Sequence, residues 1–483
     1  MRRSVGVLCL VMAMVLAACG ARFKGSGIRV SGGGAGATAT GSDNGGVSAG
    51  DSGSTAGGTD TGGASGGSAG ASGSAGGGGS LNGSGSAGGL ATGGASGGSG
   101  GATSGPGAGP IGSTQGVTAN SIKIAVLLPI TGAAPVPTSI KESITVAFEY
   151  INRIGGINGR MIIPDIMDTQ STSTGAKAAA QKAIEDDKVF LITILDRIDI
   201  QEAVAAYTQS KNFPDVEFQM TPHPPSSQDW VWGLTIDQGD QGKLIADYLV
   251  KVLHEKKLGV VTEQQTQLAA GRNEFVAEAN ALGAQVVYND QIDGQGNDYG
   301  ANTLNAKNSG AEGVWMYVAP TPAIKFANQA NGIGYQPVWF ADAISWEFNL
   351  TLQSGGYPAM AKAKAFSEWP TLDDPSTATY KQAYADHDKQ DNSTTQADDL
   401  GIPSFGVIQI ISAALKATGP NLGQDAFKRT MSNFTYQPPD KTWAPVSFTP
   451  GKRVGTNEVN VYRVGTINGQ PGWQTDRTYT SGF

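Results

Sequence analysis

Residues 122–160 read IKIAVLLPITGAAPVPTSIKESITVAFEYINRIGGINGR, and this stretch predicts a strand, a loop and a helix. Residues 122–128 form a nearly continuous apolar run, as in a strand that is covered on both faces of its sheet. Ser139 and Glu142 have the spacing of a capping box, and apolar residues then recur at helical intervals. The loop over residues 129–138 follows the carboxyl end of the strand, which is where open α/β sheets bind ligands.

The N-terminus has the features of a secretion signal. Arg2 and Arg3 precede an apolar core at residues 5–15, which is too short to span a bilayer as a mature helix, and Leu-Ala-Ala-Cys closes the segment at Cys19. The segment resembles the signal peptide of a bacterial lipoprotein. The resemblance implies that residues 1–18 are removed and that Cys19 carries a diacylglycerol group, which would anchor the protein to the extracytoplasmic side of the cell membrane. The alternative is an ordinary secretory signal with an incidental cysteine. We expect no later segment to cross the bilayer.

Residues 19–118 are predicted to be the lipidated cysteine and a disordered tether behind it. From about residue 24 to residue 116 the sequence is Gly, Ser, Ala and Thr with scattered exceptions. Such a composition cannot bury enough apolar surface to offset the entropy that ordering the chain would cost. The mean reach of the tether would be on the order of 50 to 60 Å, so a folded domain could stand clear of the membrane.

Composition narrows the classes of function. The only cysteines, Cys9 and Cys19, lie in and directly after the apolar N-terminal run, so we expect no disulfide or cysteine metal site after processing. The formal charge of -8 becomes -10 without residues 1–18, which hold two arginines and no acid, and this acidity argues against nucleic acid as a partner. The three histidines lack the H-E-x-x-H spacing, and there is no P-loop or Cys–His dyad, so we expect neither an enzyme nor a cofactor. Hydrolysis by carboxylates alone is the alternative.

Beyond residue 119, predicted strands and helices alternate. Strands are predicted at 122–128, 161–166, 189–195, 216–220, 231–236, 258–262, 285–288, 313–318 and 337–340. Helices after the first are predicted at 175–185, 200–210, 241–254, 271–282, 298–308 and 321–331. This order is typical of parallel βαβ units, and its length of about 360 residues favours two doubly wound lobes over one large sheet. Residues 380–391 predict a helix with a solvated face, and about 60 C-terminal residues predict closing strands of both lobes.

Four segments together resemble one known family. They are LLPITG at 127–132, EYINRIGGINGR at 149–160, TIDQGDQG at 235–242 and APVSF at 444–448. Their order and spacing are similar to those of the solute-binding proteins of ABC transporters, in particular the type I set that includes the branched-chain amino-acid (Leu/Ile/Val) receptors.

The resemblance implies an α/β fold of two doubly wound parallel-sheet lobes joined by a three-segment hinge. The first lobe would comprise residues 119–238 plus 367–443, and the second residues 239–366 plus 444–483. It also implies a small-molecule ligand that is captured between the lobes and delivered to a membrane permease.

The resemblance also indicates which residues would contact the ligand. After the third strand, the family usually has a serine at a helix N-terminus that holds the ligand's carboxylate, and this chain has Asp196 and Arg197 instead. Asp196 would repel a carboxylate, whereas Arg197 would attract one in a bidentate pair. The alternatives are that Asp196 or Asp199 caps the next helix and that Arg197 is an ordinary exposed arginine. His223 stands where the family often has small residues lining the site, and its alternative is a turn residue in a Pro-rich loop.

Acidic residues are retained where the family binds an ammonium group. Asp240 and Asp342 match these positions, although Asp240 would otherwise cap the helix that follows it. Tyr317 ends a strand and would line the second lobe. Thr131 and Thr138 are the polar contacts that we expect from the loop of the first lobe.

The retained acids and the missing serine predict a ligand with an amino, amide or other donor-rich group. We therefore expect a monomeric, extracytoplasmic solute-binding lipoprotein that takes up an amino acid or a related amine or amide and serves an ABC permease. The alternative is a surface lipoprotein that uses the same fold to present a ligand-dependent face to a receptor.

Overall fold

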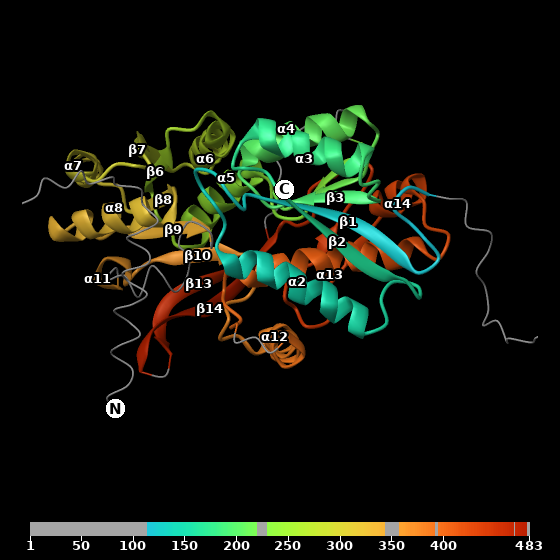
Figure 1. Ribbon diagram of the computed structural model, residues 1–483. Coiled ribbons are helices and arrows are strands. Elements are labelled where there is room, and N and C mark those ends of the chain that lie inside the picture. Colours follow the sequence, from blue (N-terminus) through green and yellow to red (C-terminus); the bar gives the residue numbers. More distant parts are fainter. Residues whose placement is uncertain (1–113, 220–228, 343–356, 392–394, 468, 481–483) are drawn as a thin grey trace, which may run out of the picture. The chain divides into compact units, whose positions relative to one another are not determined.

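The computed structural model describes residues 114–219, 229–342, 357–391, 395–467 and 469–480. These residues belong to one compact unit, residues 100–483, and two β-sheets with helices on both faces organise it (Figure 1). The predicted signal peptide, Cys19, the predicted tether up to residue 113 and His223 lie outside the described residues.

The first sheet has five parallel strands in the order β2-β1-β3-β4-β5. The strands are β1 (Ser121–Leu128), β2 (Met161–Asp168), β3 (Leu191–Ile194), β4 (Asp215–Glu217) and β5 (Val231–Gly233). β1 pairs with a strand on each side, and Ile122, Ile124 and Leu128 are fully buried. The continuous apolar run is thus explained by helices on both faces of the sheet.

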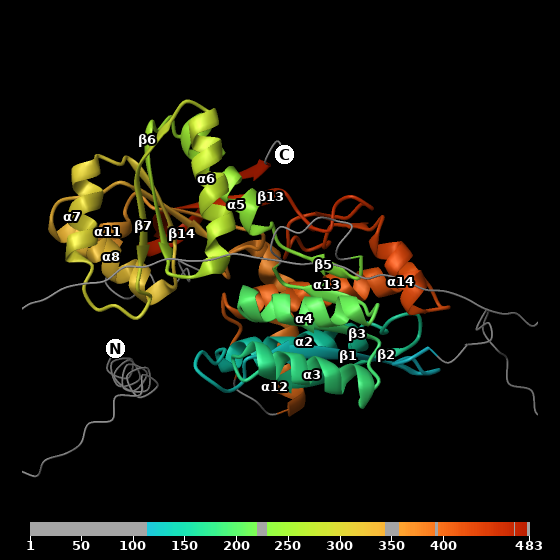
Figure 2. The ribbon, with the colours of Figure 1, turned by 90° about the horizontal axis from the view of Figure 1, so that it is seen from above.

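Helices cover both faces of the first sheet (Figure 2). α3 (Ser173–Glu185) and α4 (Ile198–Ser210) pack together on one face. α2 (Thr138–Arg153) lies on the other face and packs against α12 (Ala378–Asp391) and α13 (Gly401–Thr418). α14 (Gln424–Met431) packs against α13. The chain therefore returns to the first sheet after most of the second has been built.

The second sheet has seven strands in the order β14-β13-β10-β9-β8-β6-β7. β13 pairs antiparallel with both β14 and β10, and the remaining pairs are parallel. The strands are β6 (Lys257–Glu263), β7 (Gln285–Ile292), β8 (Gly313–Tyr317), β9 (Val338–Asp342), β10 (Lys364–Ser367), β13 (Glu458–Ile467) and β14 (Gln470–Thr480). Both long C-terminal strands therefore belong to the second sheet. The sequence predicts instead that the C-terminal residues supply closing strands to both lobes.

Helices also cover both faces of the second sheet. One face packs on α5 (Gln238–Asp247), its continuation as a π-helical turn at Tyr248–Val252, and α6 (Ala269–Ala281). The other face packs on α7 (Gly300–Ser309), α8 (Pro320–Gly332) and α11 (Tyr357–Met360). Short 3-10 turns lie at Thr266–Leu268 and Pro375–Thr377.

Three segments connect the two sheets. The first joins β5 to α5, and the second follows β10. The third passes Ala444 and β12 (Val446–Ser447), which pairs with β11 (Thr435–Tyr436), on its way to β13. The Ala444 N–H donates to the carbonyl oxygen of Glu368 at 2.6 Å, so the second and third segments lie side by side. The boundary predicted after residue 443 falls in the third segment, whereas those after residues 238 and 366 fall one residue inside α5 and one residue before the end of β10.

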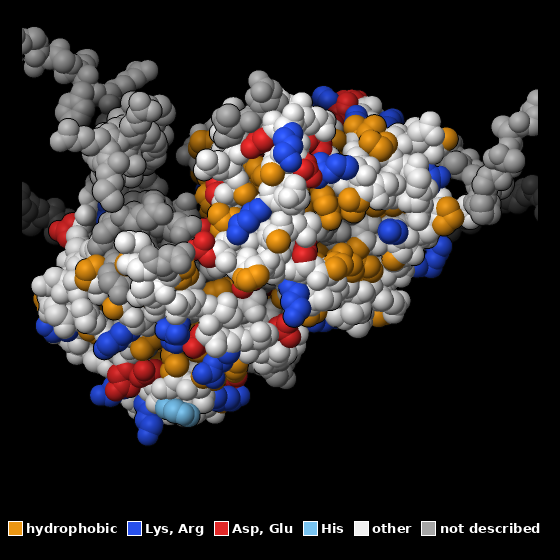
Figure 3. Space-filling view, turned by 90° about the horizontal axis from the view of Figure 1, so that it is seen from below, with side chains coloured by type: hydrophobic (Ala, Val, Ile, Leu, Met, Phe, Trp, Pro, Cys, Tyr) orange, Lys and Arg blue, Asp and Glu red, His pale blue; other side chains and the backbone are white. Residues whose placement is uncertain are grey.

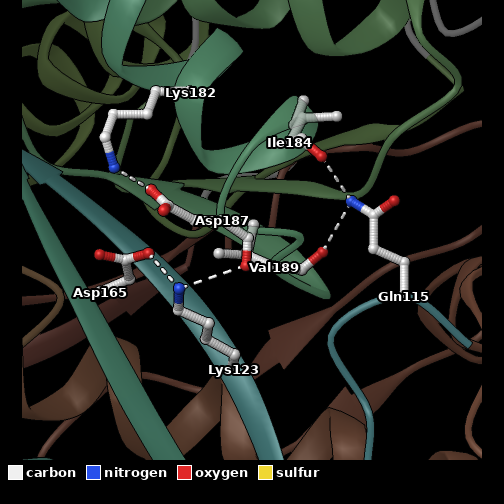
Figure 4. Close-up of polar contacts among 7 residues, drawn as sticks. All are labelled: Gln115, Lys123, Asp165, Lys182, Ile184, Asp187 and Val189. Carbon is white, nitrogen blue, oxygen red and sulfur yellow. Dashed lines mark hydrogen bonds and ion pairs between the residues drawn. The ribbon is translucent and has the colours of Figure 1, made fainter.

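A polar network holds the chain where it enters the first sheet (Figure 4). The Gln115 side-chain amide donates to the carbonyl oxygens of Ile184 and Val189 at 2.9 and 3.1 Å. Lys123 on β1 pairs with Asp165 on β2 at 2.9 Å. These contacts lie near the amino ends of β1 and β3, so the carboxyl edge of the sheet stays open for ligand-binding loops.

The start of α2 differs from the prediction. Ser139 does not cap the helix, because α2 begins at Thr138 and its N-cap residue is Pro137, with no side-chain cap hydrogen bond. The φ of Pro137 is -53°, so the proline ring presets the backbone at the helix entrance.

Two C-terminal helices are more buried than the sequence indicates. α12 is polar in composition, yet Tyr380, Tyr384 and His387 are buried, so it is not simply a solvated face. Among the described residues, α13 is long and apolar enough to cross a membrane, which the sequence reading did not expect. Because 78% of its most apolar window is buried, α13 is a core helix here.

Candidate ligand-binding site

A cavity of about 470 Å³ lies at the carboxyl ends of strands from both sheets. Asp196 follows β3 in the first sheet. In the second sheet Tyr317 ends β8, Asp342 ends β9 and Glu368 follows β10. This is the place at which open α/β sheets bind ligands, and here two such edges share one cavity.

Three buried or half-buried carboxyl groups line this cavity. Asp342 is 8% exposed and accepts a hydrogen bond from the Gln241 amide at 3.2 Å. Glu368 is 4% exposed, and burial raises its pKa to about 7. Burial also raises the pKa of Asp196, whose carboxylate accepts a hydrogen bond from the Thr169 hydroxyl. A positive charge in the cavity would stabilise the ionised form of each group.

A fourth acid belongs to the wall formed by the second sheet. The Glu263 carboxylate accepts hydrogen bonds from the Ala319 N–H at 2.7 Å and from the Gln265 amide at 2.6 Å. The acidic side chains are gathered in the cavity, and the outer surface in Figure 3 does not share this excess. On the face shown in Figure 3, Lys and Arg side chains are interspersed with Asp and Glu.

Arg197 is the only lysine or arginine among the described residues that line the cavity. Its Nε and Nη2 donate to the two carboxylate oxygens of Asp199 at 3.1 and 3.0 Å, and its side chain is 51% exposed. This bidentate pair with Asp199 uses one of the guanidinium edges that can bind a carboxylate. Neither Asp196 nor Asp199 caps α4, because Arg197 is the N-cap residue and no side-chain cap hydrogen bond forms.

Gln241 lines the cavity and carries a buried acceptor. The residue is 2% exposed, and its Oε1 has no hydrogen-bond partner within the part of the chain that the structure describes. A buried acceptor without a partner costs about 1–3 kcal/mol. A ligand N–H or O–H group would satisfy it beside the carboxylate of Asp342.

Aromatic rings supply apolar walls. The rings of Phe218 and Trp369 are 5.7 Å apart, and Tyr317 stacks on Trp315 at 5.3 Å. Burial raises the pKa of Tyr317, so its hydroxyl is neutral, and it accepts a hydrogen bond from the Gln238 amide at 3.1 Å. The cavity thus suits a molecule with an apolar part and a cationic or donor-rich part.

Thr131 does not line the cavity, although Ala134 from the same loop does. The N–H and hydroxyl of Thr131 donate to the carboxylate of Asp168 at 3.0 and 2.5 Å. Desolvation would raise the pKa of Asp168, but the hydrogen bonds from Thr131 and the neighbouring backbone outweigh it and lower the pKa. Thr131 therefore orders its own loop.

Thr138 and Asp240 also lie outside the cavity lining. Thr138 is the exposed first residue of α2. Asp240 lies in the first turn of α5 and pairs with Lys243 at 3.2 Å. Asp237 caps this helix by accepting the Asp240 N–H at 2.8 Å, so the cap predicted at Asp240 is wrong.

The cavity brings together four of the residues that we predicted, namely Asp196, Arg197, Tyr317 and Asp342. Sequence reasoning missed Glu368 and Gln241. Glu368 could have been predicted from the sequence, because it is an acid directly after a strand and next to the predicted lobe boundary at 366/367. Gln241 could not have been predicted, because a glutamine in the first turn of a helix is ordinarily solvated.

The sequence profile described as periplasmic binding protein matches residues 121–470. The chain belongs to the periplasmic binding protein family. The match spans the first sheet, the connecting segments and the second sheet up to the start of β14.

Sequence relatives of this periplasmic binding protein carry names that refer to amino acids. The Leu/Ile/Val-binding protein homolog 3 of Brucella melitensis is 24% identical over 204 residues, which are 40% of this chain and 54% of that protein. An amino acid binding protein of Pseudomonas aeruginosa is 26% identical over 223 residues, which are 43% and 57% of the two chains. The chain spans about half the length of these relatives.

Solved structures share the fold over a larger part of the chain. A leucine binding protein of Thermotoga maritima has a TM-score of 0.59 at 17% identity and covers 74% of this chain and 99% of its own. A solute binding protein of an ABC transporter from Rhodopseudomonas palustris, in complex with p-hydroxybenzoic acid, has a TM-score of 0.63 at 15% identity, with 75% and 97% covered. The predicted type I fold of two α/β lobes is confirmed.

Proposed function

We propose that this periplasmic binding protein captures a small molecule with an amino, amide or other donor-rich group in the cavity between its two lobes. The observation that carries the proposal is the set of groups that line one cavity. Asp196, Asp342 and Glu368 offer carboxylates, and Gln241 offers a buried acceptor. The guanidinium of Arg197 is already paired with Asp199.

A cationic ligand would offset the cost of burying ionised carboxylates in the cavity. Burial raises the pKa of Glu368 and Asp196, so proximity to an ammonium or amidinium group would lower both. Binding of a cation would therefore release protons near neutral pH, and the affinity would increase as the pH rises. An anionic ligand would instead cause proton uptake on binding, and its affinity would decrease as the pH rises.

The ligand class follows from what the site provides and from the names of its relatives. One relative is named for leucine, isoleucine and valine and another for amino acids, and these names favour an amino acid. The α-carboxylate of such a ligand would require a donor, and the charged groups in the described lining are carboxylates and an arginine that is paired with Asp199. A related amine or amide without that carboxylate fits the lining better.

We further propose that the protein is a lipoprotein that delivers this ligand to an ABC permease. The support is the lipobox at Cys19, the long Gly/Ser/Ala segment that follows it and the family itself. A Cys19→Ser variant should fail to incorporate labelled palmitate and should be released from the membrane fraction. Unchanged labelling in that variant would remove the lipid anchor from the proposal.

The ligand class is tested by a thermal-shift screen of the purified protein over small metabolites, followed by calorimetric titration of each hit. Amines, amidines and amides should raise the melting temperature, and simple carboxylic acids should not. L-leucine, L-isoleucine and L-valine belong in the same panel. Micromolar binding of any of the three would contradict a preference for ligands without a carboxylate, while leaving capture between the lobes intact.

A further inference from the structure

A histidine and two carboxylates meet between two helices of the first lobe, outside the cavity described above. Glu149 lies on α2, and His387 and Asp391 lie one turn apart on α12. His387 Nδ1 is 2.8 Å from Glu149 Oε2 and 3.6 Å from Asp391 Oδ2. One ligand atom from each residue lies within 4.8 Å of the other two.

The helices themselves hold this cluster together. α12 packs against α2. The Tyr384 hydroxyl donates to the Ser139 carbonyl at 3.3 Å, and Arg153 pairs with Asp386 at 3.1 Å. These contacts lie on both sides of Glu149 along α2, so packed helices hold the Glu149 carboxylate and the His387 imidazole close to each other.

The spacing suits a small divalent cation. Zinc binds histidine nitrogen and carboxylate oxygen at about 2.0–2.2 Å, so two ligand atoms at a tetrahedral angle lie roughly 3.4 Å apart. The two distances from His387 Nδ1, 2.8 and 3.6 Å, lie on either side of that value. A small rotation of the Glu149 carboxylate would open the room that an ion needs.

Burial is graded across the cluster. The side chain of His387 is 7% exposed, that of Glu149 is 27% exposed and that of Asp391 is 49% exposed. An ion could therefore enter past Asp391, rest on a buried imidazole and keep a water as its fourth ligand. Imidazole nitrogen with carboxylate oxygen is a donor set that zinc accepts.

The charges also favour an ion. A protonated imidazole would neutralise one of the two carboxylates and leave a net charge of about -1, whereas a divalent cation with neutral imidazole neutralises both. We propose that Glu149, His387 and Asp391 form a three-ligand site for a divalent transition cation of the zinc class, which clamps α12 to α2. The site does not depend on the identity of the ligand in the cavity.

The test is a titration of the purified, chelator-treated full chain with Zn²⁺ by calorimetry and with Co²⁺ by visible absorption. One equivalent should bind, Co²⁺ should show the bands of a tetrahedral nitrogen and oxygen site, and saturating Zn²⁺ should raise the melting temperature. Asp391→Asn and His387→Gln should each weaken binding by more than the roughly tenfold that loss of a supporting residue costs. His254→Gln, a histidine substitution elsewhere in the chain, should leave binding unchanged.

Circular dichroism of each variant separates loss of the site from loss of the fold. Asp391→Asn is the safer probe, since its side chain is half exposed. Binding that survives both variants would overturn the proposal. So would the absence of saturable binding by the unmodified protein, which would leave the cluster as a polar contact between α2 and α12.

Discussion

Glu368 Oε1 accepts a hydrogen bond from the Ile236 N–H at 3.1 Å, so a side chain from the second connecting segment holds the backbone of the first. The Glu368 carbonyl accepts the Ala444 N–H of the third segment, and the side chain also lines the cavity. One buried residue thus belongs to the connection between the lobes and to the ligand site. If lobe closure is a hinge motion, the charge of the ligand would act on the same carboxyl group that holds two of the hinge segments together.

Glu368→Gln should weaken the pH dependence of stability. The pKa of Glu368 is raised from 4.5 to about 7, so between these values the folded state holds the proton more tightly than the unfolded state. Its contribution is therefore full below about pH 4.5 and is lost as the pH rises through about 7, on the order of 3 kcal/mol in total. Glutamine keeps an acceptor for the Ile236 N–H and carries no charge. Urea unfolding from about pH 5 to pH 8 should show a smaller loss of stability in the variant than in the unmodified protein, and an identical loss would refute the assignment.

Glu217→Gln provides a matched comparison away from the cavity lining. Glu217 is 2% exposed on β4, and burial, followed by repulsion from Asp215, raises its pKa well above the ordinary value. By the same sign argument, the variant should be more stable than the unmodified protein at about pH 8 and equal to it at low pH. Its ligand affinity should be unchanged, whereas Glu368→Gln should lower the affinity for a cationic ligand. Equal effects of the two variants on binding would contradict a role for Glu368 in the site.

Asp342→Asn should weaken ligand binding without weakening the fold. Asparagine keeps an oxygen for the Gln241 amide and removes the charge that would face a ligand cation. A hydrogen bond to a charged group contributes about 1.5–3 kcal/mol, so the dissociation constant should rise roughly tenfold or more. Asp240→Asn is the control, since Asp240 pairs with Lys243 outside the cavity lining. Calorimetry should show a change only for the first variant, and a comparable change for the control would mean that overall charge is being measured.

Gly116→Ala should destabilise the entry of the chain into the first sheet. Gly116 has a φ of +76°, and a Cβ there would lie 2.1 Å from the Phe190 backbone nitrogen. Gly159 has a φ of +82° with no atom within 4 Å of the corresponding Cβ position, so Gly159→Ala reports the cost of the backbone conformation alone. That cost is about 1–3 kcal/mol, and Gly116→Ala should lose more because of the added clash. Equal melting temperatures for the two variants would contradict the close approach to Phe190.

The elements that burial dictates could be predicted from the sequence. β1 was evident because both of its faces are covered, which requires a continuous apolar run, and α2 because its apolar stripe faces one side. The helix caps could not be predicted as well, because Ser139 and Asp240 have the right chemistry but the helices begin at other residues. The burial of α12 was hidden for a related reason, since Tyr380 and His387 are amphipathic and read as polar.

The candidate site was predicted only where a residue ends a strand. Asp196, Tyr317 and Asp342 lie at carboxyl ends of strands, and parallel topology brings such ends together. Thr131 has the right position in a loop, but its hydroxyl is used by Asp168. Gln241 reaches the cavity from a helix, and only the fold shows that its amide carbonyl lacks a partner among the described residues.

The central claim is that the cavity selects positive charge over negative charge. Its most direct test is calorimetric titration of the purified protein with the strongest amine or amidine found in the thermal-shift screen, and with the analogue in which a carboxylate replaces the cationic group. The account predicts that the cation binds at least about tenfold more tightly, with an affinity that increases from about pH 6 to pH 8 as Glu368 gives up its proton. Equal or tighter binding of the carboxylate, or an affinity that falls over that range, would contradict it.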